Sequence, residues 1–476
     1  MNSMSKWLLI NPPTGKYIRD TRCQASVDDI FAITERPPID LAYIAGAITK
    51  NRHNCYIIDC PIEGVDWYQL EQCIYKNEIA YIVINTTMFS YKEDLKTCTL
   101  CKKINEKIVT IAKGAVFFDN PEQKMADYPD LDIAVSAEEE FVFSLISNNN
   151  MTLDTIPNIA YRKDGKIFVN QKLFNHDLKL PAPCIDQINH KLYKRPDKNE
   201  MQASIVVGRG CPGRCIYCIA PIVGGKYARY REIEEIIAEI KMYYERYHIT
   251  NFYFSADTFT FNHIWVKQFC EAILNLDFRI AWLCTARADS ITEDIISIIK
   301  KAGCWGVSIG IETGDEEIQK KIRKNLTVET IDKAIKICRK YKIVTLLHFI
   351  IGFPWDNDKT IRKTIKLAKR LKGNIIEFYI ATPLPGTELF DIVSNNAKLM
   401  YKNSIDRLNQ VTATHNTYYV NSRELVAYRK KALRSIYFNP FFYLNSLKYI
   451  SSLKQFVNCA RFLLMKFKKI IYKRKK

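Results

Sequence analysis

The residues best suited to chemistry are three cysteines within eight positions of one another, Cys211, Cys215 and Cys218. Thiolates are the usual ligands of iron–sulfur clusters, and short spacings let one loop wrap a single cluster. This C-x3-C-x2-C group follows an apolar strand pattern, with Gly210 before the first cysteine and Tyr217 before the last. Three ligands on a four-iron cluster leave one iron open to a further molecule.

Two other uses of closely spaced cysteines fit less well. A structural zinc site needs a fourth ligand, and no nearby histidine or cysteine supplies one with a familiar spacing. A thioredoxin-like redox pair needs only two cysteines. The spacing therefore favours a cluster.

The remaining cysteines indicate a reducing compartment. The chain has 15 cysteines among 476 residues, an odd number that is scattered along the sequence. No signal peptide pattern precedes them, so we expect free thiols and a cytoplasmic protein. Cys270, Cys304 and Cys338 have apolar neighbours and are expected to be small buried side chains.

The charge balance is strongly basic. There are 70 Lys and Arg against 51 Asp and Glu, for a formal net charge of +19. The two signs are interspersed, which favours a solvated Lys-rich surface over nucleic-acid binding. The clearest local excess is Lys466–Lys476, and no apolar run approaches the length of a membrane span, about 18 residues.

Residues 1–145 alternate short apolar runs with helical patterns. Strands separated by helices predict a parallel, doubly wound, Rossmann-like sheet. Residues 146–200 break this alternation and are expected to be a connector that lies across the next domain, with a hairpin turn at Asp164 and Gly165.

Residues 201–400 resume the alternation with greater regularity. Six strands joined by helices predict a (β/α)6 partial TIM barrel, and an open Rossmann-like sheet is the alternative. The strands are expected near 204–207, 251–254, 280–283, 305–311, 344–350 and 375–380. In either architecture a ligand belongs at the carboxyl ends of the strands.

Residues 401–476 lose the strand pattern and are expected to be helical. Aromatic residues at 437–443 precede the basic end. These helices are expected to close the barrel, and a peripheral contact with a membrane surface or a partner is the alternative.

The cysteine motif, together with the order of strands after it, resembles the radical S-adenosylmethionine superfamily. The resemblance implies a [4Fe-4S] cluster ligated by Cys211, Cys215 and Cys218. It also implies that S-adenosylmethionine chelates the open iron and is cleaved by one electron to a 5′-deoxyadenosyl radical. Such chemistry belongs to the cofactors, while the protein supplies geometry and excludes water.

The same resemblance assigns S-adenosylmethionine contacts to residues at the strand ends. Asp257 stands where the family has a short acidic motif, Arg287 resembles a carboxylate contact, and Ser308-Ile309-Gly310-Ile311-Glu312 resembles the family's G-x-E motif. The implied contacts are Tyr217, Asp257, Arg287, Ser308, Gly310 and Glu312. Gly352-Phe353-Pro354 and Pro385-Gly386-Thr387 are similar to turns of the family and also shape turns.

The first domain resembles the cobalamin-binding branch, which includes the anaerobic magnesium-protoporphyrin ester cyclase and several radical methylases. The resemblance rests on residues 36–46, 57–60 and 85–87 and implies cobalamin contacts from Asp59, Asn85, Thr86, Thr87 and Gly114. Three departures stand out. The chain has no Asp-x-His-x-x-Gly motif, it has Lys113-Gly114-Ala115 where the family often has a Gly-Gly pair, and it reads Ala137-Glu138-Glu139-Glu140 where the family often has Gly-Glu-Gly-Glu.

These implications lead to a cobalamin-dependent radical methyltransferase that acts on an unactivated centre of a small molecule. The expected electron donor is flavodoxin or ferredoxin. Three alternatives remain: radical cyclisation, rearrangement or oxidation without methyl transfer; methylthiotransferase-like tRNA modification; and a non-catalytic module with a structural cluster. No catalytic residue is assigned from the sequence.

Overall fold

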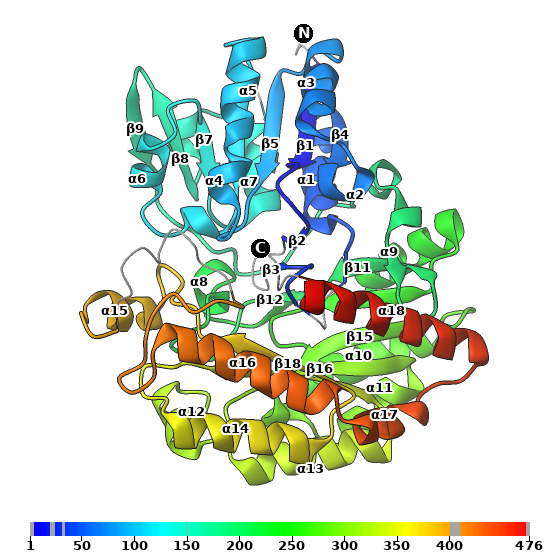
Figure 1. Ribbon diagram of the computed structural model, residues 1–476. Coiled ribbons are helices and arrows are strands. Elements are labelled where there is room, and N and C mark those ends of the chain that lie inside the picture. The colour runs from blue at the N-terminus through cyan, green and yellow to red at the C-terminus, as the bar shows by residue number, and fades with distance from the viewer. Residues whose placement is uncertain (1–3, 20–23, 31–33, 149, 400–409, 473–476) are drawn as a thin grey trace. The chain divides into compact units, whose positions relative to one another are not determined.

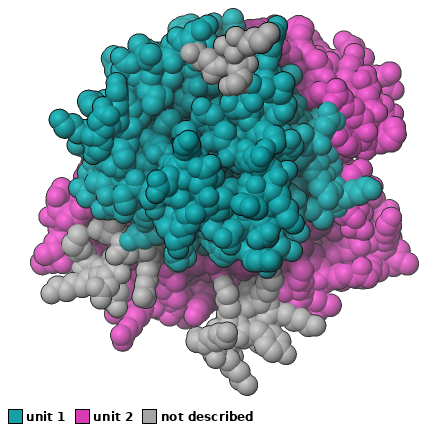
Figure 2. All heavy atoms as spheres, turned by 90° about the horizontal axis from the view of Figure 1, so that it is seen from above, with its two compact units in different colours: residues 1–26, 35–193, 222–225 teal, residues 27–34, 194–221, 226–476 magenta. Residues whose placement is uncertain are grey.

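The computed structural model describes residues 4–19, 24–30, 34–148, 150–399 and 410–472. These residues form two compact units (Figure 2). The first contains residues 1–26, 35–193 and 222–225, and the second contains residues 27–34, 194–221 and 226–476. Helices and strands are labelled in Figure 1, and both units belong to the α/β class that the sequence predicts.

The first unit is built on a seven-stranded sheet in the order β4-β1-β5-β6-β7-β8-β9. Five of its strands are parallel: β1 (Lys6–Asn11), β4 (Asn54–Asp59), β5 (Tyr81–Asn85), β6 (Val109–Lys113) and β7 (Ile133–Val135). Numbered along the chain, their order is 2-1-3-4-5, which is a doubly wound order with its switch point at β1 and β5. Connections of this kind leave a crevice at the carboxyl ends of these two strands.

The other elements of the first unit are mostly helical. The longer helices are α1 (Ile39–Lys50), α3 (Trp67–Lys76), α5 (Lys96–Ile104) and α7 (Glu139–Ile146). Shorter elements are α2 (Cys60–Glu63), α4 (Tyr91–Asp94), α6 (Pro121–Ala126) and the small antiparallel pair β2 (Tyr17–Ile18) and β3 (Ala25–Ser26).

Part of the predicted connector continues the first sheet. The hairpin expected at Asp164 and Gly165 is present as β8 (Ile159–Lys163) and β9 (Lys166–Val169), and β8 pairs with β7 antiparallel. Farther along, a Cβ on Gly46 would lie 2.0 Å from the Ala182 carbonyl oxygen, so glycine permits this close crossing over α1. Residues up to Tyr193 accordingly belong to the first unit.

The second unit is built on a sheet in the order β10-β11-β14-β15-β16-β17-β18. Six strands run parallel in chain order: β11 (Glu200–Val206), β14 (Asn251–Ser255), β15 (Ala281–Ala286), β16 (Cys304–Glu312), β17 (Val344–Ile351) and β18 (Ile375–Ile380). β10 (Lys194–Arg195) adds an antiparallel edge that the sequence pattern did not predict. Since β18 and β11 are not neighbours, the sheet is an open, curled half-barrel.

Helices follow each of the first five parallel strands. They are α9 (Ile233–Tyr247), α10 (His263–Leu274), α11 (Glu293–Lys301), α12 (Glu316–Lys321), α13 (Val328–Lys340) and α14 (Asp358–Leu371). Side chains of Asn262, Thr292, Asp315, Thr327 and Asn357 accept backbone N–H groups at the start of α10 to α14. These caps satisfy donors that a helix start leaves unpaired.

The parallel strands present two different faces. Along β16 and β17, buried residues such as Ile309, Leu347 and Phe349 alternate with half-buried Ser308 and His348. Successive strand residues point to opposite faces, and α13 and α14 contact β17. The half-buried polar residues therefore line the face away from these helices.

The predicted tail of residues 401–476 contains α16 (Ser422–Tyr437), α17 (Pro440–Leu447) and α18 (Leu453–Tyr472), preceded by α15 (Glu388–Ser394). Residues 410–421 are not helical, and residues 400–409 lie outside the described part. α16 covers β18: the Tyr437 hydroxyl donates to the Ile376 carbonyl at 2.8 Å, and Arg429 donates to the buried Glu377 carboxylate at 3.0 Å. Among the described helices, none has the length and apolarity of a membrane-spanning segment.

Candidate functional site

The cysteine loop lies at the carboxyl end of β11. It begins after β12 (Gly208–Arg209), and the chain returns through α8 (Ala220–Val223) to β13 (Arg229–Tyr230), which pairs with β12. The Gly210 amide donates to the Asp257 carboxylate at 2.7 Å, just beyond the end of β14. Gly210 has φ +86, a left-handed backbone that favours glycine. Asp257 thus fixes the start of the loop.

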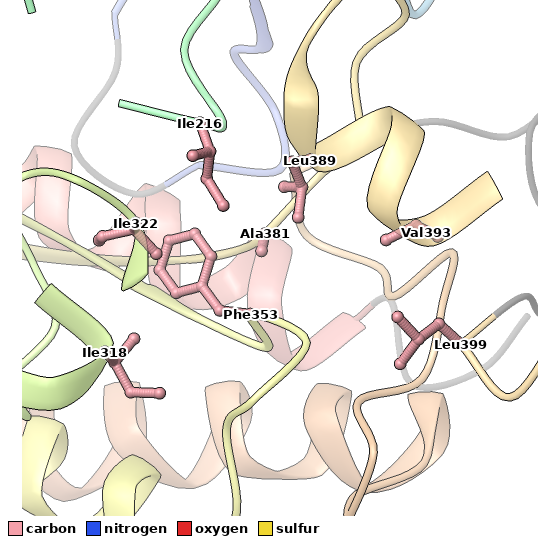
Figure 3. Packing of buried hydrophobic residues seen from close by; sticks show 8 residues of the cluster. All are labelled: Ile216, Ile318, Ile322, Phe353, Ala381, Leu389, Val393 and Leu399. Atoms are coloured by element: carbon pink, nitrogen blue, oxygen red, sulfur yellow. The ribbon is translucent and has the colours of Figure 1, made fainter. Parts of the chain in front are cut away.

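The middle of the loop is anchored by Ile216, between the second and third cysteines. Its amide donates to the Ile322 carbonyl at 3.2 Å, and its carbonyl accepts from the Leu389 amide at 2.9 Å. The side chain is buried in an apolar cluster shown in Figure 3, with Ile318, Ile322, Phe353, Ala381, Leu389, Val393 and Leu399. The loop is therefore held by the core of the second unit.

The three thiols are half-buried. Cys211 Sγ accepts from the Gly213 amide at 3.4 Å, and Cys215 Sγ lies 3.8 Å from the Arg323 carbonyl oxygen. Burial raises the pKa of Cys211. No three His, Cys, Asp or Glu side chains in the described ranges converge on one ion-sized point. The ligands of a four-iron cluster bind different iron atoms, so their arrangement differs from that of a single-ion site.

The G-x-E motif forms an irregular end of β16. The register between β16 and β17 shifts between Gly310 and Glu312, and Glu312 has φ +68, which is uncommon for a non-glycine residue. A Cβ on Gly310 would lie 2.4 Å from the Glu312 carboxylate and 3.1 Å from the Lys324 ammonium. Glycine at 310 thus makes room for an ion pair, in which Lys324 donates to Glu312 at 2.9 Å.

Two cations lie close to the thiols. The Arg287 guanidinium donates to the Lys324 carbonyl at 3.1 Å and forms a two-bond contact with Asp289. Burial opposes a charged Lys324, but Glu312 and Cys215 beside it raise its pKa. Arg287 also interacts electrostatically with Cys211 and Cys215. Positive charge beside a thiol favours its thiolate form, which is the form that ligates metals.

Tyr217 joins the cysteine loop to the motif residues. Its ring packs against Phe353 with a centroid distance of 5.5 Å, and its hydroxyl bonds to the Glu312 carboxylate. Burial, with Glu312 beside it, raises the pKa of Tyr217 well above its ordinary value. The structure thus brings together Cys215, Tyr217, Arg287 and Glu312 from the predicted set.

Ser308 makes a different set of contacts. Its hydroxyl bonds to His348 Nε2 at 2.7 Å, and His348 Nδ1 bonds to the Tyr379 hydroxyl at 3.1 Å. The three residues come from the adjacent strands β16, β17 and β18. This row of polar side chains was not predicted, because the sequence around a lone histidine in an apolar strand does not show which residues of other strands lie beside it.

The turn after β17 is held by two buried ionisable groups. The Asp356 carboxylate accepts from the amides of Gly352 and Phe353 at 2.8 and 3.0 Å, and burial raises its pKa to about 6. His415 Nε2 bonds to the Gly352 carbonyl at 2.9 Å, and burial lowers the pKa of His415 to about 4. The bond to the carbonyl requires that Nε2 carry the proton.

We expect acid to destabilise this turn through His415. In the unfolded chain His415 binds a proton near its ordinary pKa of 6.5, whereas in the folded chain its pKa is about 4. Folding stability is therefore lost as the pH falls from 6.5 towards 4. Between about pH 7.5 and about pH 5 the loss from this group is about 2 kcal/mol. Urea unfolding at both pH values should show a smaller acid loss for His415→Gln than for the unaltered chain. Equal losses would contradict the assignment.

In the first unit, two cobalamin candidates lie at the carboxyl ends of strands. Asp59 ends β4, accepts from the Tyr193 hydroxyl at 2.7 Å, and has a pKa raised by burial to about 6. Asn85 ends β5, and its amide donates to Asn11 at 2.9 Å and to Asp40 at 3.1 Å. Its buried Oδ1 has no hydrogen-bond partner among the described atoms.

The other three candidates make internal contacts. The Thr86 hydroxyl donates to the Lys113 carbonyl at 2.8 Å, and the Thr87 hydroxyl accepts from the amides of Phe89 and Ser90. Gly114 has φ +143, and a Cβ there would lie 2.7 Å from the Thr86 hydroxyl. These residues shape the backbone between β5 and β6.

A buried charge cluster also lies beside β6. Lys113 is 1% exposed and forms ion pairs with Asp40 and with Glu139, the latter at 2.7 Å. Glu139 Oε1 has no hydrogen-bond partner among the described atoms, and burial raises the pKa of Glu139. The preceding Glu138 has φ +49, a backbone that glycine adopts more easily, and Glu139 itself stands where the resembling family often has glycine.

Comparisons with known proteins identify the second unit. Residues 205–368 match the model of the Radical SAM superfamily, so this part of the chain is a radical SAM domain. An uncharacterized methyltransferase of Pyrococcus horikoshii is 28% identical over 84% of this chain and 85% of its own length. The anaerobic magnesium-protoporphyrin IX monomethyl ester cyclase of Rubrivivax gelatinosus is 24% identical over 76% of this chain and 67% of its own length.

Solved structures share the fold at low identity. The radical S-adenosylmethionine methyltransferase TsrM from Kitasatospora setae, with cobalamin and a [4Fe-4S] cluster bound, covers 84% of this chain and is itself covered to 77%, with a TM-score of 0.67 and 15% identity. The cobalamin-dependent radical enzyme OxsB covers 98% of this chain and is covered to 72%, with a TM-score of 0.73 and 14% identity. The solved structures thus show the fold of the chain, and the family match over residues 205–368 makes it a radical SAM enzyme.

Proposed function

We propose that this radical SAM enzyme holds a [4Fe-4S] cluster through Cys211, Cys215 and Cys218 and transfers a methyl group, with the help of cobalamin, to an unactivated centre of a small molecule. The observation that carries the proposal is the cysteine loop, whose thiols lie beside Arg287, Lys324 and the Glu312–Tyr217 pair at the carboxyl edge of the sheet. The methyltransferase names of relatives that span most of the chain support the reaction type.

The residues present fit a cluster. Three thiols stand on one short loop whose backbone is bonded at Gly210 and at Ile216, and the cations Arg287 and Lys324 lie beside Cys215. A bound cluster with S-adenosylmethionine supplies a one-electron reduction that yields a 5′-deoxyadenosyl radical. The chain's own part is to hold the thiols in order and to bury Ile216, so that water does not enter beneath the loop.

Residues around the loop also suit S-adenosylmethionine, which carries a carboxylate, an ammonium and ribose hydroxyls. Arg287 can bind a carboxylate, and Glu312 can accept from an ammonium or a hydroxyl. Tyr217 orients Glu312 through its hydroxyl, and Gly310 leaves room for the Glu312–Lys324 ion pair. Asp257 contributes by holding Gly210, and Ser308 contributes through the row with His348 and Tyr379.

The first unit suits cobalamin at its switch point, where the carboxyl ends of β1 and β5 meet. The unpaired Asn85 Oδ1 is an acceptor for an amide N–H, and a corrinoid carries several amides. Asp59, at the carboxyl end of β4, is a second hydrogen-bond acceptor at this edge of the sheet. Thr86, Thr87 and Gly114 shape the backbone that follows β5 and β6. Bound cobalamin would carry the transferred methyl group.

Anaerobic reconstitution with iron, sulfide and cobalamin tests both units in one experiment. We expect the charge-transfer absorption of a [4Fe-4S] cluster, bound corrinoid in mass spectrometry, and S-adenosylhomocysteine that forms only when cobalamin is present. Reductive formation of 5′-deoxyadenosine without bound corrinoid or S-adenosylhomocysteine would contradict methyl transfer. That result would favour the second candidate, a radical cyclisation or oxidation, which the cyclase relative supports.

The remaining partners are also proposals. A low-potential donor such as flavodoxin or ferredoxin would deliver the electron, and a small-molecule substrate would lie on the strand face that carries His348 and Tyr379. The 15 cysteines, with free thiols in the described part, suit the reducing cytoplasm.

A further inference from the structure

Helix α18 is drawn in red in Figure 1. Its polar side chains contact other segments of the second unit. Gln455 Nε2 donates to the Asp197 carboxylate at 2.8 Å, and Asn458 Nδ2 donates to the Asp197 carbonyl at 3.2 Å. Farther along the helix, the buried Lys466 ammonium donates to the carbonyls of Val27 and Ile30, both at 2.9 Å. Polar contacts along its length therefore fix which side of the helix faces the protein.

The opposite side of α18 is apolar and exposed. Leu453, Val457, Ala460 and Leu464 recur at the spacing of one helical stripe, with Phe456 beside them. The exposed fractions are 78% for Leu453, 46% for Phe456, 43% for Val457 and 62% for Leu464. A surface helix ordinarily buries such a stripe in the core. This helix presents it to the solvent.

The same region concentrates the positive charge of the chain. Residues 425–476 contain 14 Lys and Arg and no Asp or Glu, which accounts for +14 of the formal net charge of +19. Lys454 and Arg461 are exposed on α18 and stand seven residues apart, so both flank the same side of the apolar stripe. The exposed face thus combines apolar residues with cations and lacks acidic residues.

We propose that α18 lies flat on the surface of a membrane that contains anionic lipids. The apolar stripe would enter the boundary between head groups and acyl chains, while Lys454 and Arg461 contact lipid phosphates. Two features of the chain favour lipid over other occupants. A second copy would bring the same concentration of positive charge against this face, and a nucleic acid would leave the apolar stripe in water.

Vesicle sedimentation of the full-length reconstituted protein tests the proposal. We expect binding to vesicles of phosphatidylcholine mixed with phosphatidylglycerol, weaker binding at high salt, and little binding to phosphatidylcholine alone. Leu464→Asp should weaken binding by at least about tenfold, because it removes an apolar side chain that the membrane would bury and adds a charge that anionic lipids repel. Circular dichroism verifies that the variant is folded.

Ile264→Asp is the matched control. Ile264 is 72% exposed on α10 of the same unit, so its replacement makes an equal chemical change away from the proposed face. Equal vesicle binding by the two variants would overturn the proposal. Dimerisation through this face would also overturn the proposal. Sedimentation velocity would show it if Leu464→Asp dissociates a dimer while vesicle binding is unchanged.

Discussion

Cys215→Ala is expected to lower the reductive formation of 5′-deoxyadenosine by at least about a thousandfold, which corresponds to about 4 kcal/mol in the activation barrier. Cys215 is the central thiol of the three and interacts electrostatically with both Lys324 and Arg287. Its loss leaves one iron without a protein ligand, so iron content should fall together with the rate. Chromatography of the nucleoside and colorimetric iron analysis measure both effects.

Cys270→Ala controls for the loss of a thiol as such. Cys270 is a buried free cysteine of α10, and its replacement leaves a small cavity that costs about 1 kcal/mol of stability. This variant should keep its iron and its rate. If Cys215→Ala also retained full iron and nucleoside formation after reconstitution, the assignment of the cluster to this loop would be wrong.

Lys113→Met is expected to destabilise the first unit by about 3 to 5 kcal/mol. The lysine is 1% exposed and lies between Asp40 and Glu139, and the latter is itself 3% exposed. Methionine removes the only charge that the described contacts place between these two carboxylates, which leaves Glu139 buried without a counter-charge. Hydrogen exchange of peptides from β5 to β7 should report the loss in this unit separately from the other.

Two further variants define the origin of this loss. Lys107→Met removes an exposed lysine that precedes the same strand and should change stability by less than about 0.5 kcal/mol. Lys113→Met combined with Glu139→Gln should recover part of the loss, because the buried negative charge is then absent. A double variant that is no more stable than Lys113→Met would indicate that packing, and not charge, is responsible.

The regular parts of the fold could be predicted from the sequence because local periodicity determines them. The six parallel strands of the half-barrel were expected close to their observed positions, and Gly210 to Cys218 follow the first of them as predicted. β10 was not predicted, because a two-residue antiparallel edge has no pattern of its own. The hairpin β8–β9 was predicted, but its pairing with β7 depends on distant residues.

The site could be predicted where a motif is contiguous, and not where contacts join distant residues. Glu312 and Tyr217 were both named, whereas their partner Lys324 was missed because it lies on a loop without a motif. Likewise Asp257 was named as a cofactor contact, but its bond to the Gly210 amide was not predicted. Carboxylates at strand ends have many available donors, and only the folded chain shows which donor is used.

The buried Ile216 has a consequence for how a metal cofactor is installed. Because the core holds the loop at its centre, we expect cluster insertion to be a ligand exchange that requires little ordering of the chain. The entropy of loop ordering is then part of the folding of the polypeptide and is absent from the affinity for iron. Proteolysis within residues 211–218 should accordingly be equally slow in the iron-free and iron-loaded protein.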